Sequence, residues 1–353
     1  MSASTSDSRS REATRAALAL TLAPGIGPAR HRDLVALHGG PIPALLRAVP
    51  ESGRREALLD EADRHLIAGA AAGLDLWCST DARYPASLAD LPDPPPVLWA
   101  LGDAGAVAPP LVAIVGTRRC TAYGERVTKE LARALARAGV SIVSGMARGI
   151  DAAAHEAALE AGGRTVAVLG TGADVAYPAV HRRLHAAIAR GGLLLSEAPP
   201  GRGATPGAFP RRNRIIAALA PVLVVVEAGV ASGALITARV ALDLGRTIAA
   251  VPGPIDVPQS AGTNELLRDG AVVIAAVADA LALVGATPAV VHSTPVDDPD
   301  ALAVWSALAD GPLDVDGLCA RSRLPAARCL GAVTALELSG RVECALTGEI
   351  RRR

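Results

Sequence analysis

The chain has 353 residues, half of them apolar, so it can bury a large core and is not an intrinsically disordered protein. Its 35 basic and 35 acidic residues cancel, which excludes a protein that attracts polyanions through its overall charge. Only 2% of the residues are aromatic, so stacking platforms for nucleobases should be few.

The five cysteines show neither a CxxC pair nor a histidine at metal-ligand spacing, so neither a zinc site nor a disulfide framework is predicted. No apolar stretch reaches the about 18 residues of a membrane span, and the polar N-terminus leads into an apolar run too short for a signal peptide. We therefore expect a cytoplasmic protein without a metal, a cofactor or a membrane contact.

Residues 1–10 are predicted to be a disordered tail and residues 11–75 a helical module. Two helical patterns in this module flank the sequence PGIGP at 24–28, which is typical of a helix–hairpin–helix, or SAM-like, module. Such a hairpin can hold a duplex phosphate with its backbone amides, helped by Arg30 and Arg32, or it can serve packing alone. Residues 76–108, which contain LPDPPP, are predicted to be a stiff connector.

Short apolar runs alternate with helical patterns over residues 109–285. This alternation predicts an α/β fold, a Rossmann-like parallel sheet covered by helices on both faces. The expected strands are 112–115, 141–144, 165–169, 193–196, 222–226 and 247–251, with 272–274 as a possible edge. Ligands of such sheets bind beyond the C-terminal ends of the strands.

A linker is predicted at 286–300 and a C-terminal winged helix at 301–350. The last domain shows three short helical patterns, followed by a turn at Gly348 that could join the two strands of a wing. Its predicted recognition helix offers only Arg328 as an exposed cation, so docking a protein is at least as plausible as reading DNA.

Two strand ends carry residues suited to binding anions. The first expected strand ends at Gly116, which lets the backbone approach a phosphate, and Arg118 and Arg119 follow as cations. The second ends in SGMARGID at 144–151, where two glycines allow close approach and Asp151 can cap free amides. No acid stands at the tip of this second strand to bind a ribose, which counts against a dinucleotide oxidoreductase.

Arginines gather where acids are absent. No acid lies between Val175 and Ser196 or between Ala198 and Val226. These two stretches contain Arg182, Arg183, Arg190, Arg202, Arg211, Arg212 and Arg214. They predict an anion-binding groove wide enough for several phosphates, unless the arginines pair with acids at the strand ends such as Glu197.

Two further helix starts extend the predicted groove. The sequence FPRRNRII at 209–216 places arginines where a helix dipole also favours anions. Ser232 can cap the next helix and Gly233 can expose its amides. Glu227 could be a general base, but a structural carboxylate is favoured because no histidine stands near it in the sequence. No catalytic motif is recognised, so no catalytic residue is predicted.

In this order and spacing, VAIVGTRR, SGMARGIDAAAH, AVLGTGADVAYP, LLLSE, FPRRNRII, VVVEAGVASGALITAR and AVPGPI closely resemble the DNA-processing protein A (DprA/Smf) family over about residues 109–275. The resemblance implies an extended Rossmann domain that binds single-stranded DNA and is not an enzyme. It also implies a homodimer that protects incoming strands in natural transformation and helps to load the RecA recombinase. The hairpin module and the winged helix look like optional appendages of longer members.

The matching segments and their neighbours give the predicted site. The phosphate-binding residues are Gly116, Thr117, Arg118, Arg119, Ser144, Gly145, Arg148, Gly149, Arg211, Arg212, Asn213, Arg214, Ser232 and Gly233, and the supporting residues are Asp151, His155, Glu227 and Thr237. Thr117 replaces the family's common Ser, and Arg211 replaces a Lys found in many members. An alternative is a nucleoside-monophosphate phosphoribohydrolase-like enzyme on a related Rossmann core, with Glu227 as its base.

Overall fold

A computed structural model describes residues 2–286, 298–338, 341–345 and 348–352. The chain divides into two compact units, Met1–Ala289 and Val290–Arg353. No helix in these described ranges is both long enough and apolar enough to cross a membrane.

Four helices form the N-terminal module: α1 (Ser2–Leu22), α2 (Pro28–His38), α3 (Pro41–Ala48) and α4 (Ser52–Ala71). Residues 2–10, for which the sequence predicts a disordered tail, belong to α1. No glycine or proline precedes Pro24, so nothing in the sequence stops this helix before its packed turns, which start near Ala16.

The hairpin between α1 and α2 turns its arginines onto the protein's own carbonyl groups. Arg30 Nη1 donates to Gly25 O at 3.3 Å, and Arg32 Nη1 donates to Pro92 O at 2.8 Å. These two contacts favour the interpretation of this module as a packing element.

Residues 76–108 are not a connector, because they contribute two strands to the sheet. β1 (Asp75–Cys78) pairs antiparallel with β2 (Val97–Gly102), and β2 pairs antiparallel with β6. Trp77 and Trp99 are only 1% exposed, and Trp99 packs against Gly69 of α4. The strands were missed because each apolar run is short and prolines stand between them.

The sheet has nine strands in the order β1-β2-β6-β5-β4-β3-β7-β8-β9, and the pairs from β6 to β9 are parallel. Its remaining strands are β3 (Leu111–Val115), β4 (Ser141–Ser144), β5 (Thr165–Leu169), β6 (Leu193–Ser196), β7 (Val222–Val225), β8 (Thr247–Ala250) and β9 (Val272–Val273). All seven strands predicted for this region are confirmed to within a residue or two at their ends.

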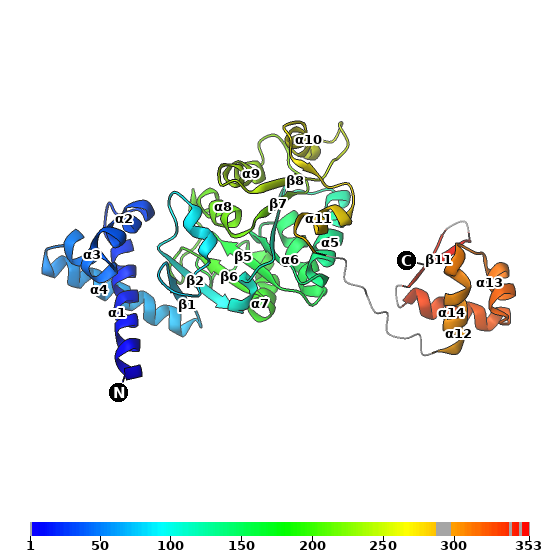
Figure 1. Cartoon of the computed structure of the whole chain (residues 1–353), viewed down its shortest axis with the longest axis horizontal. Coiled ribbons are helices and arrows are strands. Elements are labelled where there is room, and N and C mark those ends of the chain that lie inside the picture. The colour runs from blue at the N-terminus through cyan, green and yellow to red at the C-terminus, as the bar shows by residue number, and fades with distance from the viewer. Residues whose placement is uncertain (1, 287–297, 339–340, 346–347, 353) are drawn as a thin grey trace. The chain divides into compact units, whose positions relative to one another are not determined.

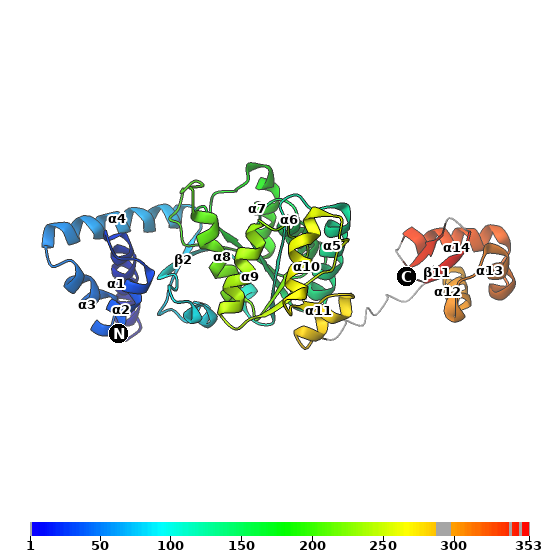
Figure 2. The same ribbon diagram turned by 90° about the horizontal axis from the view of Figure 1, so that it is seen from above.

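Helices cover both faces of the sheet (Figures 1 and 2). They are α5 (Ala122–Arg137), α6 (Ile150–Glu160), α7 (Arg182–Gly191), α8 (Ala208–Leu219), α9 (Gly233–Asp243), α10 (Ala261–Arg268) and α11 (Val277–Leu283). Side chains of β3 alternate between the layers: Val112 and Ile114 join the core under α5 and α6, and Ala113 and Val115 join the core under α8 and α9.

The strand order reverses at β3. The chain runs outward from β3 through β4, β5 and β6, and then returns to place β7, β8 and β9 on the other side of β3. The C-terminal ends of β3 and β7 therefore open a crevice, which is the usual ligand position in a doubly wound sheet.

The second unit contains α12 (Pro299–Ala307), α13 (Val315–Ser322), α14 (Ala326–Leu338), β10 (Val342–Cys344) and β11 (Ile350–Arg352). The two strands pair antiparallel, so the predicted winged helix is confirmed. Arg328 on α14 is paired with Asp300 at 2.5 Å, which offsets the charge that favoured DNA reading. Most of the predicted linker, residues 287–297, lies outside the described residues.

Candidate functional site

The first cavity lies at the reversal of strand order and has a volume of about 630 Å³. The loops after β3, β4 and β7, together with α8 and the start of α9, form its walls. Among its lining residues are Gly116, Thr117, Arg118, Arg119, Asp151, Arg212, Asn213, Ser232, Gly233 and Thr237. The structure therefore brings together ten of the predicted site residues from four separate segments.

Two glycines let the loops of this cavity approach each other closely. A Cβ on Gly116 would stand 2.8 Å from Glu227 O and 2.5 Å from the side chain of Ile150. Gly149 has a φ of +77°, and a Cβ there would stand 2.4 Å from Thr117 O. Any larger side chain would push the loops after β3, β4 and β7 apart.

Glu227 is buried and holds the start of α5. Its Oε1 accepts a hydrogen bond from Thr121 Oγ1 at 2.5 Å, and its Oε2 accepts one from Thr121 N at 2.9 Å. A Cβ on Gly124 would stand 2.3 Å from the same carboxyl group. A carboxylate anchored at a helix N-terminus by both oxygens fits a structural role.

Several predicted polar side chains bond the protein itself. Ser144 is fully buried and its Oγ donates to Ile114 O at 2.6 Å, so it ties β4 to β3 and lines none of these cavities, which differs from the prediction. Ser232 Oγ accepts from Ala234 N and caps α9, as expected. Thr237 Oγ1 donates to Gly233 O at 3.3 Å, and Asn213 Nδ2 lies 3.4 Å from the same carbonyl oxygen.

A second cavity of about 320 Å³ adjoins the first and contains an aromatic pair. The rings of Tyr177 and Phe209 lie 5.1 Å apart between centroids, and Arg118 Cζ lies 5.7 Å from the Phe209 ring. Arg119 and Arg148 also line this cavity. Sequence reasoning did not select the two aromatic residues, although the chain's single Phe stands two residues before the RRN segment.

Three arginines at these cavities are free of ion pairs. Arg118, Arg119 and Arg148 are exposed, and none has a carboxylate within ion-pair distance in the described parts of the chain. Their charges are therefore not offset locally. A positive charge beside exposed loop amides attracts anions.

Arg212 forms the floor between the cavities. It is 5% exposed, and its Nη1 donates to Gly145 O at 2.7 Å and to Val168 O. Burial lowers the pKa of Arg212 to about 10. Burial raises the pKa of Asp151, whose carboxyl group interacts electrostatically with the Arg212 guanidinium. Arg212 thus ties the loop after β4 to strand β5 more than it offers a free charge.

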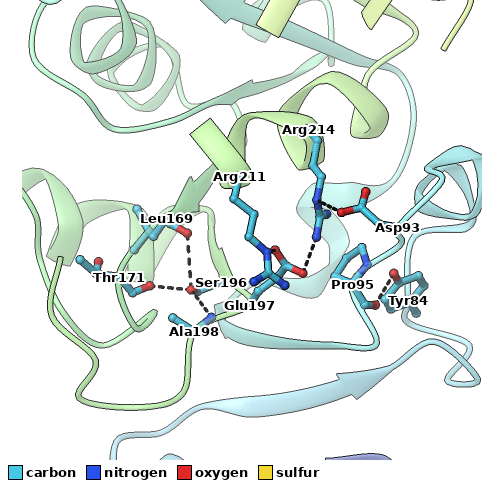
Figure 3. Close-up of polar contacts among 10 residues, drawn as sticks. All are labelled: Tyr84, Asp93, Pro95, Leu169, Thr171, Ser196, Glu197, Ala198, Arg211 and Arg214. Carbon is cyan, nitrogen blue, oxygen red and sulfur yellow. Dashed lines mark hydrogen bonds and ion pairs between the residues drawn. The ribbon is translucent and has the colours of Figure 1, made fainter. Parts of the chain in front are cut away.

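Arg214 lines none of these cavities and points to two carboxylates of the protein itself (Figure 3). Its guanidinium pairs with Glu197 Oε1 at 2.6 Å and with Asp93 Oδ2 at 3.2 Å, and its side chain is 8% exposed. Arg211 lies on the exposed side of the same carboxylate, 3.7 Å from Glu197 Oε2. The prediction that Arg214 binds a phosphate is thus corrected, since its charge is used inside the protein.

A third cavity of about 390 Å³ continues the groove over the ends of β5 and β6. Arg202 and Arg211 line it together with Glu197. Arg202 is exposed and has no ion-pair partner in the described ranges. Because Arg212 lines all three cavities, they are adjacent and form one groove along the C-terminal edge of the sheet.

The structure places no group of three or more His, Cys, Asp or Glu side chains at metal-binding distances within the ranges that it describes. His155 is fully buried, and burial lowers its pKa to about 3, so it is a neutral residue beneath the loop after β4.

Comparison with known proteins places the chain among DNA-processing proteins. The family model described as DNA recombination-mediator protein A matches residues 59–285, and a DprA winged helix domain model matches residues 286–345. A putative DNA processing protein DprA of Mycobacterium tuberculosis is 45% identical over 260 residues, which cover 71% of this chain and 67% of the relative.

Solved structures of DNA processing proteins resemble this chain. The X-ray structure of DNA processing protein A from Streptococcus pneumoniae has a TM-score of 0.59 and 38% identity, covering 64% of this chain and 81% of that one. DNA processing protein A from Helicobacter pylori, studied for its single-stranded DNA binding mode, has a TM-score of 0.54 and 35% identity. The match covers 58% of this chain and 93% of that protein.

Proposed function

Because the chain belongs to the DNA recombination-mediator protein A family, we propose that it binds single-stranded DNA in the cytoplasm, protects the strand and helps to load the RecA recombinase. The observation that carries this proposal is the convergence of Arg118, Arg119 and Arg148 on one groove without ion-pair partners among the described residues. Phosphate contacts supply most of the affinity of a protein for a nucleic acid backbone.

The shape of the groove suits a flexible strand. Three adjacent cavities give it room for several nucleotides, and Tyr177 and Phe209 offer ring faces next to the arginines. Bases of a single strand can stack on such rings, whereas bases in a duplex are already stacked on each other. The single-strand binding mode of the Helicobacter pylori relative supports the same substrate.

We propose binding without catalysis. Glu227, the candidate base of the alternative enzyme, already accepts hydrogen bonds on both carboxylate oxygens and is 2% exposed. A general base must reach the proton that it removes. The position of Glu227 therefore favours the binding protein over the phosphoribohydrolase.

The proposed homodimer has a candidate surface. An apolar groove of about 880 Å³ lies beside the edge strand β9, between α9 and α10. Val230 and Leu242 at this groove are 71% and 62% exposed. Arg239 and Glu265 also line it, so two copies related by a two-fold axis could pair opposite charges around an apolar centre.

Equilibrium binding to labelled oligothymidylate and to a duplex of equal length tests the proposed substrate. We expect tighter binding to the single strand and little difference between homopolymers.

Incubation with AMP tests the alternative enzyme, since release of free adenine would support the enzyme in place of the binding protein. RecA loading is tested by adding the chain to strands already coated with a single-strand-binding protein and measuring RecA ATPase activity.

A further inference from the structure

Met146, two residues after β4, adopts a backbone conformation that side chains other than glycine rarely take. Its φ is +56°, and its side chain is fully buried. Such a conformation persists only where the surrounding structure fixes it, and it is common at ligand-binding sites. The contacts of Met146 therefore indicate what the loop is built to hold.

One histidine holds the amide of Met146. His155 Nε2 accepts a hydrogen bond from Met146 N at 3.3 Å. Thr165 Oγ1 donates its proton to Ile142 O at 2.7 Å. His155 Nδ1 lies 2.6 Å from Thr165 Oγ1, so Nδ1 must carry a proton and donate it to this hydroxyl oxygen. His155 is thus a neutral imidazole with both ring nitrogens engaged.

A second histidine holds the carbonyl of Met146. His181 Nδ1 lies 3.1 Å from Met146 O, and because a carbonyl oxygen only accepts, Nδ1 is the donor. His181 ends the short helix η3 (Ala179–His181), which directly follows Tyr177 and Pro178. The hydrogen bond joins the loop after β4 to the loop that carries Tyr177.

The neighbours of Met146 are fixed as well. Gly145 O accepts from Arg212, and Ala147 N donates to Asp151 Oδ2 at 3.3 Å. Arg148 is the exception, because its side chain is exposed and makes no ion pair within the described ranges. Arg148 and Tyr177 line the same cavity of about 320 Å³. Arg148 follows Met146 closely in the chain and Tyr177 precedes His181, so the hydrogen bond between His181 and Met146 joins the two loops that carry them.

We propose that His181 is a positioning residue for strand binding, an inference that rests on the proposed function. His181 lines none of the three cavities of the groove. By holding Met146 O, it keeps Arg148 and the Tyr177 loop at a fixed separation before the strand arrives. Preorganisation of this kind improves affinity because binding then orders fewer groups.

The test compares two substitutions of His181 in the full chain. His181→Leu removes the donor, whereas His181→Asn keeps an N–H where Nδ1 stands. We expect His181→Leu to weaken oligothymidylate binding about fivefold to tenfold, as the loss of one hydrogen bond would. It should also lower the dependence of log K on log salt by about 0.7, the contribution of one phosphate contact, because Arg148 is no longer held. His181→Asn should bind like the wild type.

Val180→Ala is the matched control, since Val180 is adjacent and 68% exposed. The effects of His181→Leu and Arg148→Ala should be less than additive when combined, because His181 acts through Arg148. Full additivity, or wild-type affinity and salt dependence in a folded His181→Leu chain, would overturn the inference. If His181→Leu does not fold, His181→Gln replaces it. The amide of Gln stands one methylene further from the backbone than that of Asn, so it does not place an N–H where Nδ1 stands. Absence of strand binding by the wild type would instead count against the proposed function.

Discussion

Burial of His155 gives the stability of the chain a specific pH dependence. The pKa of His155 falls from 6.5 to about 3 because the charged ring would lose its hydration, and Arg212 and His181 add repulsion. On acidification the unfolded chain therefore takes up a proton before the folded chain does. The stability contributed by neutral His155 is complete above pH 6.5 and is lost as the pH falls toward 3.

Between pH 6.5 and pH 5 this one group should reduce the free energy of unfolding by about 2 kcal/mol. Urea unfolding at both pH values measures the loss. His155→Gln should be less stable than the wild type at pH 6.5 but should lose less on acidification, because its amide does not titrate. Equal losses in the two chains would contradict this account of His155.

At the same scale, Glu227 shows where sequence reasoning was sufficient. A structural carboxylate was favoured because no histidine stands near it in the sequence, and the two hydrogen bonds to Thr121 agree with that preference. Ser144 shows the opposite case, since its hydroxyl bonds Ile114 O. The sequence alone does not show to which side of a strand end a small polar side chain turns.

Helix α8 is the element for which the sequence-based prediction differs most from the structure, because its three arginines have different roles. Arg211, Arg212 and Arg214 were expected to bind phosphates together, yet a helix turns about 100° per residue and so points them in different directions. Arg214 meets Glu197 and Asp93, of which Asp93 comes from a loop more than one hundred residues away in the chain. A partner at such a separation cannot be found from local spacing.

This geometry predicts different effects for two arginines of α8. Arg214→Met should lower the free energy of unfolding by about 3–5 kcal/mol, because it leaves buried Glu197 without its closest cation. Arg211→Ala removes a 54% exposed side chain and should change stability by less than about 1 kcal/mol, while weakening strand binding. Urea unfolding and oligothymidylate binding measure both effects, and equal destabilisation by the two substitutions would contradict the assignment.

At the scale of the whole molecule, periodicity predicted the parallel sheet and the winged helix well. Unbroken apolar runs separated by helical patterns are strong signals, and the predicted strand positions agree with β3 to β9. The antiparallel pair β1 and β2 was missed because its stability comes from packing against α4 and from pairing with β6. Such long-range contacts are not visible in a short sequence window.

If the apolar groove beside β9 is the dimer interface, a charge placed in it should prevent assembly. Leu242→Asp places a charge on its exposed apolar lining and should shift the chain from dimer to monomer in sedimentation velocity. Leu37→Asp is the control, since Leu37 is 76% exposed on α2 and does not line this groove. A dimer that survives Leu242→Asp would show that the copies associate through another face.

The most direct measurement of the central claim is the salt dependence of oligothymidylate binding. Replacing Arg118, Arg119 and Arg148 together by Ala should lower the slope of log K against log salt by about 2, since each phosphate contact contributes about 0.7. Replacing the exposed arginines Arg64, Arg137 and Arg190, which do not line the groove, is the control and should leave the slope unchanged. An unchanged slope in the folded groove variant would contradict the account.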